Sequence, residues 1–174
     1  YAVAKENLKL LQRGMPEPLD YQLSNVVESD GYLISATLNF RTSLAIGETK
    51  RFVLEADPNY VHVSSDPINI VDNGDGTAAI EGNLQQIKVP YGSLSNVQIP
   101  LRDAPAPLLS VAQEPGQWIG QGRFSAPMEI MVTSIQGQVL EQGPLFVRYA
   151  VSYTISGNRS YTCTLTVFRN EKHI

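Results

Sequence analysis

The strongest constraint on the fold is a strict alternation of side-chain types near the C-terminus. Every second residue from 147 to 155 is apolar or aromatic, and the pattern resumes over 161–167 after a turn at 156–159. Successive side chains of a strand point to opposite faces, and β-branched and aromatic residues favour strands. The pattern therefore predicts an antiparallel β-hairpin.

The same period of two recurs earlier in the chain. It is clearest at 31–41 and 50–56, and Asp, Asn, Gly and Pro residues separate the alternating segments. Several short strands divided by turns are typical of a mainly β fold, here an antiparallel β-sandwich that is immunoglobulin-like or jelly-roll-like. The shorter predicted strands are 61–63, 77–80, 84–89 and 128–135.

The first residues show a different period. Tyr1, Ala4, Leu8 and Leu11 recur at helical spacing, and Gly14 followed by a proline is a common helix stop. We therefore expect one short N-terminal α-helix over 1–14 that continues from an upstream segment. An α+β domain whose sheet wraps a longer form of this helix is the alternative fold.

The length of 174 residues suits one ordinary domain or two small ones. The proline-rich segment 103–108 is a candidate internal linker. We expect a single β-sandwich domain over 15–174, because each half alone would be near the lower limit for a self-sufficient core.

Charge and composition exclude several classes of protein. The chain has 17 acidic and 13 basic side chains and a formal net charge of -4, which disfavours binding to nucleic acid. One cysteine cannot form an internal disulfide. No run approaches the roughly 18 apolar residues that a membrane-spanning helix needs, so membrane attachment would require a segment upstream of Tyr1.

Few residues form a recognisable catalytic pattern. His62 precedes Ser64 and Ser65, and a serine nucleophile needs a base and an orienting carboxylate. Neighbouring strand residues point to opposite faces, so the simpler interpretation is an exposed strand histidine beside a turn. A hydrolase centred on His62 and Ser64 or Ser65 is the least favoured function, and we expect no catalytic residues.

Metal and cofactor sites are not expected either. Cys163 lies on the apolar face of the last predicted strand, as a small hydrophobe would, and no cluster has the ligands of a zinc site. The loop beginning at Asp72 fails the EF-hand pattern, because Gly74 and Asn83 occupy ligand positions. A looser calcium site using Asp72 and Asp75 is the alternative to a hairpin turn.

The candidate contact residues are two aromatic residues and a row of threonines. Trp118, the only tryptophan, is flanked by glycines; a core residue is the favoured interpretation, and a stacking platform or peptide anchor is the alternative. Tyr91 is a second candidate anchor. The alternate face of the last predicted strand suits contact with another sheet or strand. That face carries Thr162, Thr164 and Thr166.

These observations favour a non-enzymatic structural or interaction module of a larger surface assembly. We expect an envelope-spanning secretion machine, an appendage or a virion, with an extracytoplasmic (periplasmic or cell-surface) or virion location. The partners would be other protein subunits, including copies of this chain, and no nucleic acid. The alternative is a carbohydrate- or peptide-binding β-sandwich that uses Trp118 and adjacent loops.

Overall fold

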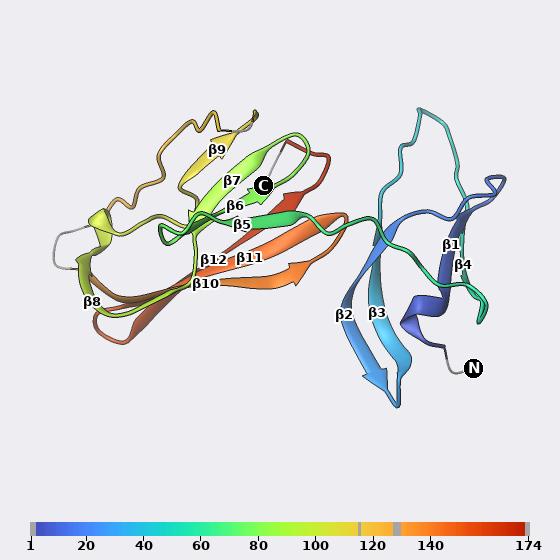
Figure 1. Ribbon diagram of the computed structural model, residues 1–174, viewed down its shortest axis with the longest axis horizontal. Coiled ribbons are helices and arrows are strands. Elements are labelled where there is room, and N and C mark those ends of the chain that lie inside the picture. Colours follow the sequence, from blue (N-terminus) through green and yellow to red (C-terminus); the bar gives the residue numbers. More distant parts are fainter. Residues whose placement is uncertain (1–2, 115, 127–129, 173–174) are drawn as a thin grey trace. The chain divides into compact units, whose positions relative to one another are not determined.

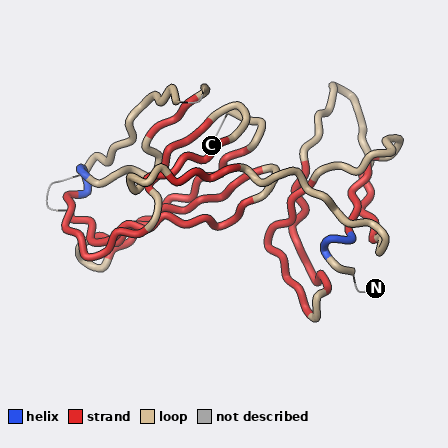
Figure 2. Tube along the Cα trace, in the orientation of Figure 1, coloured by secondary structure: helices blue, strands red, loops and turns tan. Residues whose placement is uncertain are grey.

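The computed structural model describes residues 3–114, 116–126 and 130–172. In these residues the chain is mainly β with antiparallel sheets (Figure 2). The helical turns in the described part are two short 3-10 segments, η1 (Lys5–Asn7) and η2 (Leu101–Asp103), and no α-helix is present. No helix among the described residues is long and apolar enough to cross a bilayer.

The predicted N-terminal α-helix is wrong. Leu8–Gln12 is a strand, β1, which pairs with β4 (Phe52–Ala56) so that Leu10 lies opposite Leu54. Leu8 and Leu10 are both buried, which is a period of two rather than 3.6. An isolated helix of this length is marginal in water, and the long-range ladder gives the same residues a buried face.

The chain forms two compact units, Tyr1–Asp66 and Pro67–Ile174. The single domain over 15–174 stays a prediction. The candidate linker 103–108 lies inside the second unit. Its segment is fixed there because Ala104 and Ala106 are buried and the Pro105 carbonyl accepts a hydrogen bond of 2.7 Å from the Tyr153 hydroxyl. A stretch that is stiff and proline-rich in sequence is thus part of a packed unit.

The first unit contains two two-stranded sheets, β1–β4 and β2–β3 (Figure 1). β2 is Tyr21–Ser29 and β3 is Tyr32–Phe40. The buried centre consists of Leu8, Leu10 and Tyr21, and the Tyr21 hydroxyl donates to the Leu8 carbonyl at 2.8 Å.

The strand predicted at 31–41 is confirmed as β3, but its inward face changes along its length. Leu38 packs against the core as expected, whereas Ile34 is 65% exposed and Leu33 packs inward in its place. The register of pairing with β2 shifts here, because Val27 lies opposite Ser35 while the next residue, Glu28, lies opposite Leu33. This irregularity turns the Leu33 side chain toward the core in place of Ile34. The segment 61–63, also predicted as a strand, has no regular structure.

The second unit contains two four-stranded antiparallel sheets (Figure 1). The predicted C-terminal hairpin is confirmed, and its register places Tyr153 opposite Tyr161. In spatial order, the first sheet is β12 (Arg159–Phe168), β11 (Phe146–Ile155), β10 (Met131–Gln142) and β8 (Ser93–Pro100). The second is β5 (Asn69–Asp72), β6 (Thr77–Glu81), β7 (Gln86–Pro90) and β9 (Ser110–Ala112).

Strands β4, β6 and β7 were predicted with small errors at their ends. The strand expected at 128–135 corresponds to β10, which extends to Gln142, and residues 128 and 129 lie outside the described residues. No strand was predicted at the positions of β2, β5, β8 or β9.

One core draws on both sheets of the second unit. Ile80 and Ile87 come from the β5–β9 sheet, and Val132 and Val151 come from the β8–β12 sheet; all four are fully buried. Tyr149 crosses the same core, and its hydroxyl donates to the Pro90 carbonyl at 2.8 Å. A buried aromatic ring with a satisfied hydroxyl loses little by leaving water.

Candidate functional site

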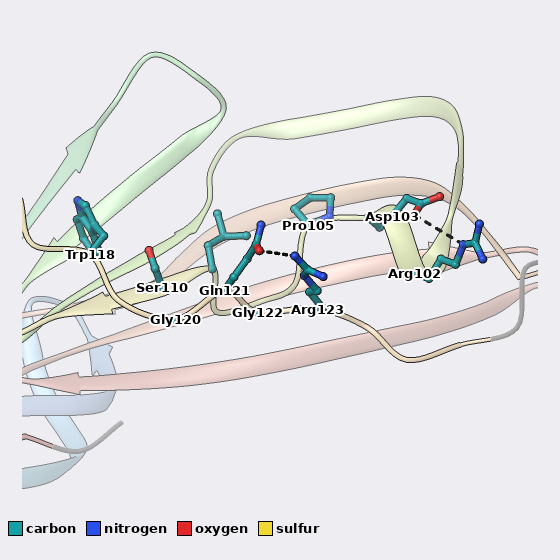
Figure 3. Close-up of a pocket in the computed structure, with 11 residues that line it drawn as sticks. Arg102, Asp103, Pro105, Ser110, Trp118, Gly120, Gln121, Gly122 and Arg123 are labelled. Atoms are coloured by element: carbon teal, nitrogen blue, oxygen red, sulfur yellow. Dashed lines mark hydrogen bonds and ion pairs between the residues drawn. The ribbon is translucent and has the colours of Figure 1, made fainter.

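A surface groove of about 710 Å³ in the second unit contains Trp118 (Figure 3). One side is formed by η2 and the residues that follow it, and the other by the segment 118–123. Trp118 lies at one end, and Arg102 and Asp103 lie at the other (Figure 3). The groove is therefore long and open, with an aromatic side chain and charged side chains at opposite ends.

The segment 118–123 extends the edge of the sheet beyond β9. Ile119 exchanges two backbone hydrogen bonds with Val111, of 2.7 and 3.0 Å, and the Gly122 N–H donates to the Leu109 carbonyl at 2.9 Å. A Cβ at position 122 would overlap the Leu108 carbonyl oxygen, so only glycine permits this approach. These contacts hold Trp118 at the rim of the groove.

The groove is lined by two arginines and one carboxylate, so its positive and negative charges do not balance. Arg102 Nε lies 3.7 Å from Asp103 Oδ1, and both side chains are largely exposed. Arg123 Nη2 donates to the neutral amide oxygen of Gln121 at 2.5 Å. Within the described chain, Arg123 forms no ion pair with a carboxylate. The groove therefore carries an excess of positive charge beside a half-buried indole, although the whole chain is acidic.

Tyr91 does not line the Trp118 groove. It is exposed in the turn between β7 and β8, and its N–H donates to the Gly76 carbonyl at 2.8 Å. It lines a separate hollow of about 520 Å³, which shares only Pro105 with the Trp118 groove. The two predicted aromatic anchors therefore occupy neighbouring sites rather than one.

The three threonines share one face of β12, as predicted. Thr162 and Thr164 are exposed and Thr166 is half-buried. Their partners on β11 are Ser152, Ala150 and Arg148, and the Thr162 and Ser152 hydroxyl oxygens are 2.9 Å apart. Since β12 is the last strand of its sheet, this face is polar, uncharged in its centre and adjacent to an unpaired strand edge.

His62 is not the exposed strand residue that we expected. Its ring stacks on Tyr21 with centroids 3.9 Å apart, and Nε2 is buried without a hydrogen-bond partner among the described residues. Asp20 Oδ1 is 3.9 Å from that nitrogen, and the Ser65 hydroxyl donates to the same carboxylate. The serine is thus bonded to the acid instead of the base, which is not the order that activates a nucleophile. Ser64 is exposed.

The carboxylates considered for calcium cap their own turns. Asp72 Oδ1 accepts the Gly74 N–H at 2.8 Å, and Asp75 Oδ1 accepts the Thr77 N–H at 3.0 Å. The Thr77 hydroxyl, aided by Lys88, lowers the pKa of Asp75. No group of three metal-ligating side chains occurs in the residues that the structure describes. Cys163 is half-buried, beside Tyr161.

Sequence reasoning found Trp118 but missed the charged part of its groove. Arg102 and Arg123 are about twenty positions apart and have no shared motif. The only local signal was the pair of glycines at 120 and 122, which allows a close backbone approach without indicating what is approached. Comparisons with protein-family models, with curated proteins and with solved structures gave no significant match for this chain.

Proposed function

We propose that the protein is a non-enzymatic interaction module that binds an extended segment of a protein partner in the Trp118 groove. The observation that carries the proposal is a single groove that combines one indole, an arginine with no carboxylate partner among the described residues, and an edge segment that pairs with the sheet at Ile119. Aromatic and arginine side chains dominate the binding energy of protein interfaces.

The backbone of the segment 118–123 supports an extended ligand. Ile119 directs both its N–H and its C=O toward Val111. In an antiparallel pair the adjacent extended residue directs its groups the opposite way, so Trp118 presents backbone groups to the open side. Gly120 has a φ of 78° and turns the chain out of the extended conformation there. No backbone hydrogen bond from either of these two residues occurs within the described part of the chain. An added strand would pair with the backbone groups of Trp118.

The charges favour an acidic partner. Among the described residues, the guanidinium group of Arg123 has only a neutral partner, the Gln121 amide. A carboxylate would form a stronger, charge-assisted hydrogen bond with it. Asp103 already accompanies Arg102, which leaves Arg123 as the cation that a ligand would neutralise. We therefore expect a segment with an acidic side chain at one end and an apolar side chain against Trp118.

The finer architecture and setting belong to the same proposal. A core shared by two four-stranded sheets supports a β-sandwich for the second unit. The polar threonine face of β12 supports a place in an extracytoplasmic or virion assembly, where that face would contact another subunit or a copy of this chain.

The test uses Trp118 as its own reporter, since no other tryptophan contributes to the fluorescence. The protein is titrated with synthetic peptides that alternate valine and glutamate, and with the same peptides carrying lysine in place of glutamate. We expect the acidic set to shift the emission and the basic set to leave it unchanged. Arg123→Gln should lower the affinity for the acidic peptides by about tenfold or more.

Arg159→Gln is the matched control, because Arg159 is exposed at the start of β12 and does not line the groove. Equal loss of binding in Arg123→Gln and Arg159→Gln would reduce the effect to overall charge and contradict the proposal. Absence of any response to the acidic peptides would also contradict it.

A carbohydrate ligand is the second candidate, favoured by the indole beside Ser110 and Gln121 in the open groove. A flat aromatic ring with nearby hydroxyl and amide groups suits a sugar. A neutral oligosaccharide panel read by the same fluorescence decides between the two. A response to sugars that survives Arg123→Gln, with none to peptides, would replace the peptide proposal.

A further inference from the structure

The connection between β3 and β4 in the first unit presents two aliphatic side chains to solvent. Leu44 is 61% exposed and Ile46 is fully exposed. Figure 1 shows this connection reaching well beyond the ends of the two strands that it joins. Exposed aliphatic side chains on a projecting loop have no role in the core of their own unit and indicate a contact surface.

The tip of this loop, residues 44–47, is held by a β-turn that runs from Ala45 to Glu48. The Glu48 N–H donates to the Ala45 carbonyl at 3.0 Å, and Glu48 Oε2 accepts the Ala45 N–H at 2.8 Å. Gly47 has a φ of 77°, which the third position of such a turn requires. Lys50 Nζ donates to the Ser43 carbonyl at 2.6 Å and closes the base of the loop. The aliphatic side chains are therefore held outward by hydrogen bonds beneath them.

Basic side chains gather under the tip. A hollow of about 520 Å³ is lined by Arg13, Lys50 and Arg51, together with Gln12, Thr49 and one carboxylate, Glu48. The Arg13 N–H donates to the Arg51 carbonyl at 2.9 Å, which keeps the two arginines adjacent along the chain surface.

The positive charge of this hollow is largely uncompensated. Glu48 accepts the Ala45 N–H and lies 3.6 Å from Lys50 Nζ, so its charge is already shared. Arg13 and Arg51 are exposed and form no ion pair within the described residues. Arg41, directly after β3, is also exposed and adds a further cation to the loop.

We propose that this loop is a peripheral attachment site for an anionic phospholipid surface. Leu44 and Ile46 enter the boundary of the acyl chains, and the basic residues of the hollow contact the headgroup phosphates. The order of apolar tip above cationic base matches the order of acyl chains and anionic headgroups in a bilayer. A protein hot spot would instead present aromatic residues or a pocket for the partner's anchor.

The site is independent of the Trp118 groove, because all of its residues lie in the first unit. It also differs from our expectation that membrane contact would require a segment upstream of Tyr1. Two aliphatic side chains and a few basic residues give reversible attachment, far weaker than insertion of a spanning helix.

The experiment is co-sedimentation of the 174-residue chain with large unilamellar vesicles. One set is pure phosphatidylcholine, and the other contains phosphatidylserine as roughly a third of the lipid. We expect binding to the anionic vesicles that weakens with added salt, and little binding to the neutral ones. Replacing both arginines in Arg13→Gln/Arg51→Gln should lower the partition coefficient by about tenfold or more, at about fivefold per cation.

The apolar contribution is tested by Leu44→Ser/Ile46→Ser, which should lower binding by at least about tenfold. Val63→Ser is the matched control, because Val63 is 85% exposed in the same unit and does not line the hollow. It should bind as the parent chain does, and circular dichroism should show all variants folded.

Three outcomes would overturn the proposal. One is no binding of the parent chain to the anionic vesicles. The second is a loss in Val63→Ser as large as in Leu44→Ser/Ile46→Ser. The third is a fall in solution mass caused by the tip variants without any change in lipid binding, which would assign the tip to a second copy of this chain.

Discussion

The two units bury their apolar side chains to very different extents. In the second unit, two four-stranded sheets contribute to one core, and residues such as Ile80 and Val151 are fully buried. In the described part of the first unit, which has two two-stranded sheets, the buried core cluster is Leu8, Leu10 and Tyr21. More than half of the large apolar side chains that are exposed in the described chain lie in the first unit, although it is the shorter one.

The difference shows how the number of strands in a sheet sets what a β unit can do. An isolated pair of strands is marginally stable, because a narrow sheet cannot cover an apolar face. The second unit therefore has the rigidity to hold a groove, and Gly122 and Ile119 are fixed there by backbone contacts. The first unit keeps apolar side chains at its surface, where they are available for contact with a partner or lipid.

The largest expected effect is selective unfolding of the first unit by a substitution in its core. Leu10 is 1% exposed, and Leu10→Ala should cost about 2–5 kcal/mol, which is a large fraction of the stability that so small a core supplies. Ile80→Ala in the second unit should cost a similar free energy and leave that unit folded. Hydrogen exchange read by mass spectrometry on peptides from each unit measures both. Equal acceleration of exchange in both units by Leu10→Ala would contradict the difference in stability between them.

A smaller effect is expected where the second unit is most tightly packed. A Cβ at Gly137 would overlap the Tyr149 hydroxyl and approach the Pro90 carbonyl to 2.5 Å, so Gly137→Ala should break their hydrogen bond. We expect a loss of about 1–3 kcal/mol in urea unfolding followed by Trp118 fluorescence. Gln138→Ala, at the exposed neighbouring position, should change the free energy of unfolding little. An unchanged midpoint in Gly137→Ala would contradict the packing.

Alkaline pH should weaken the second unit. Burial, with a smaller contribution from Tyr91, raises the pKa of Tyr149 from 10 to about 12, and burial also raises the pKa of Tyr153. Because the pKa of Tyr149 is higher in the folded state than in the unfolded state, its protonated hydroxyl stabilises the folded state fully below pH 10. This stabilisation is lost as the pH rises toward 12. Trp118 fluorescence should therefore report a falling urea midpoint above pH 10, with a shallower fall in Tyr149→Phe.

Among the described residues of the first unit, Tyr21 is the one such group. Burial, with a smaller contribution from the nearby Tyr60, raises the pKa of Tyr21 to about 12. The first unit should also lose stability above pH 10, through this tyrosine. Near-ultraviolet absorbance of tyrosinate measures the titration directly. A normal titration of Tyr149 and Tyr21 near pH 10 in the folded chain would contradict the burial of both hydroxyls.

The smallest effect concerns the loop that ends the first unit. The Ser65 hydroxyl donates to Asp20, so Ser65→Ala should cost about 1 kcal/mol or less at this exposed site. Ser64→Ala is the control, because Ser64 forms no hydrogen bond within the described part of the chain. Exchange rates of first-unit amides should rise in Ser65→Ala alone. A similar rise in Ser64→Ala would show that the Asp20 contact has no stabilising role.

Local alternation predicted the strands that carry their own signal. The hairpin of β11 and β12 was predicted because both arms alternate and the turn residues lie between them. The first strand, β1, was mistaken for a helix because Leu8 and Leu11 satisfy helical spacing while Leu8 and Leu10 satisfy strand spacing. Only pairing with β4 decides between the two, and β4 is some forty residues away.

The sequence by itself determined the mainly β class, the C-terminal hairpin and the threonine face of its last strand. These features depend on the alternation of neighbouring side chains, which a strand converts directly into two faces. Tertiary structure alone decided the division after Asp66, the stacking of His62 on Tyr21 and the meeting of Arg123 with Trp118 in one groove. Each of these depends on contacts between distant segments, and the free energy of such contacts is absent from any local pattern.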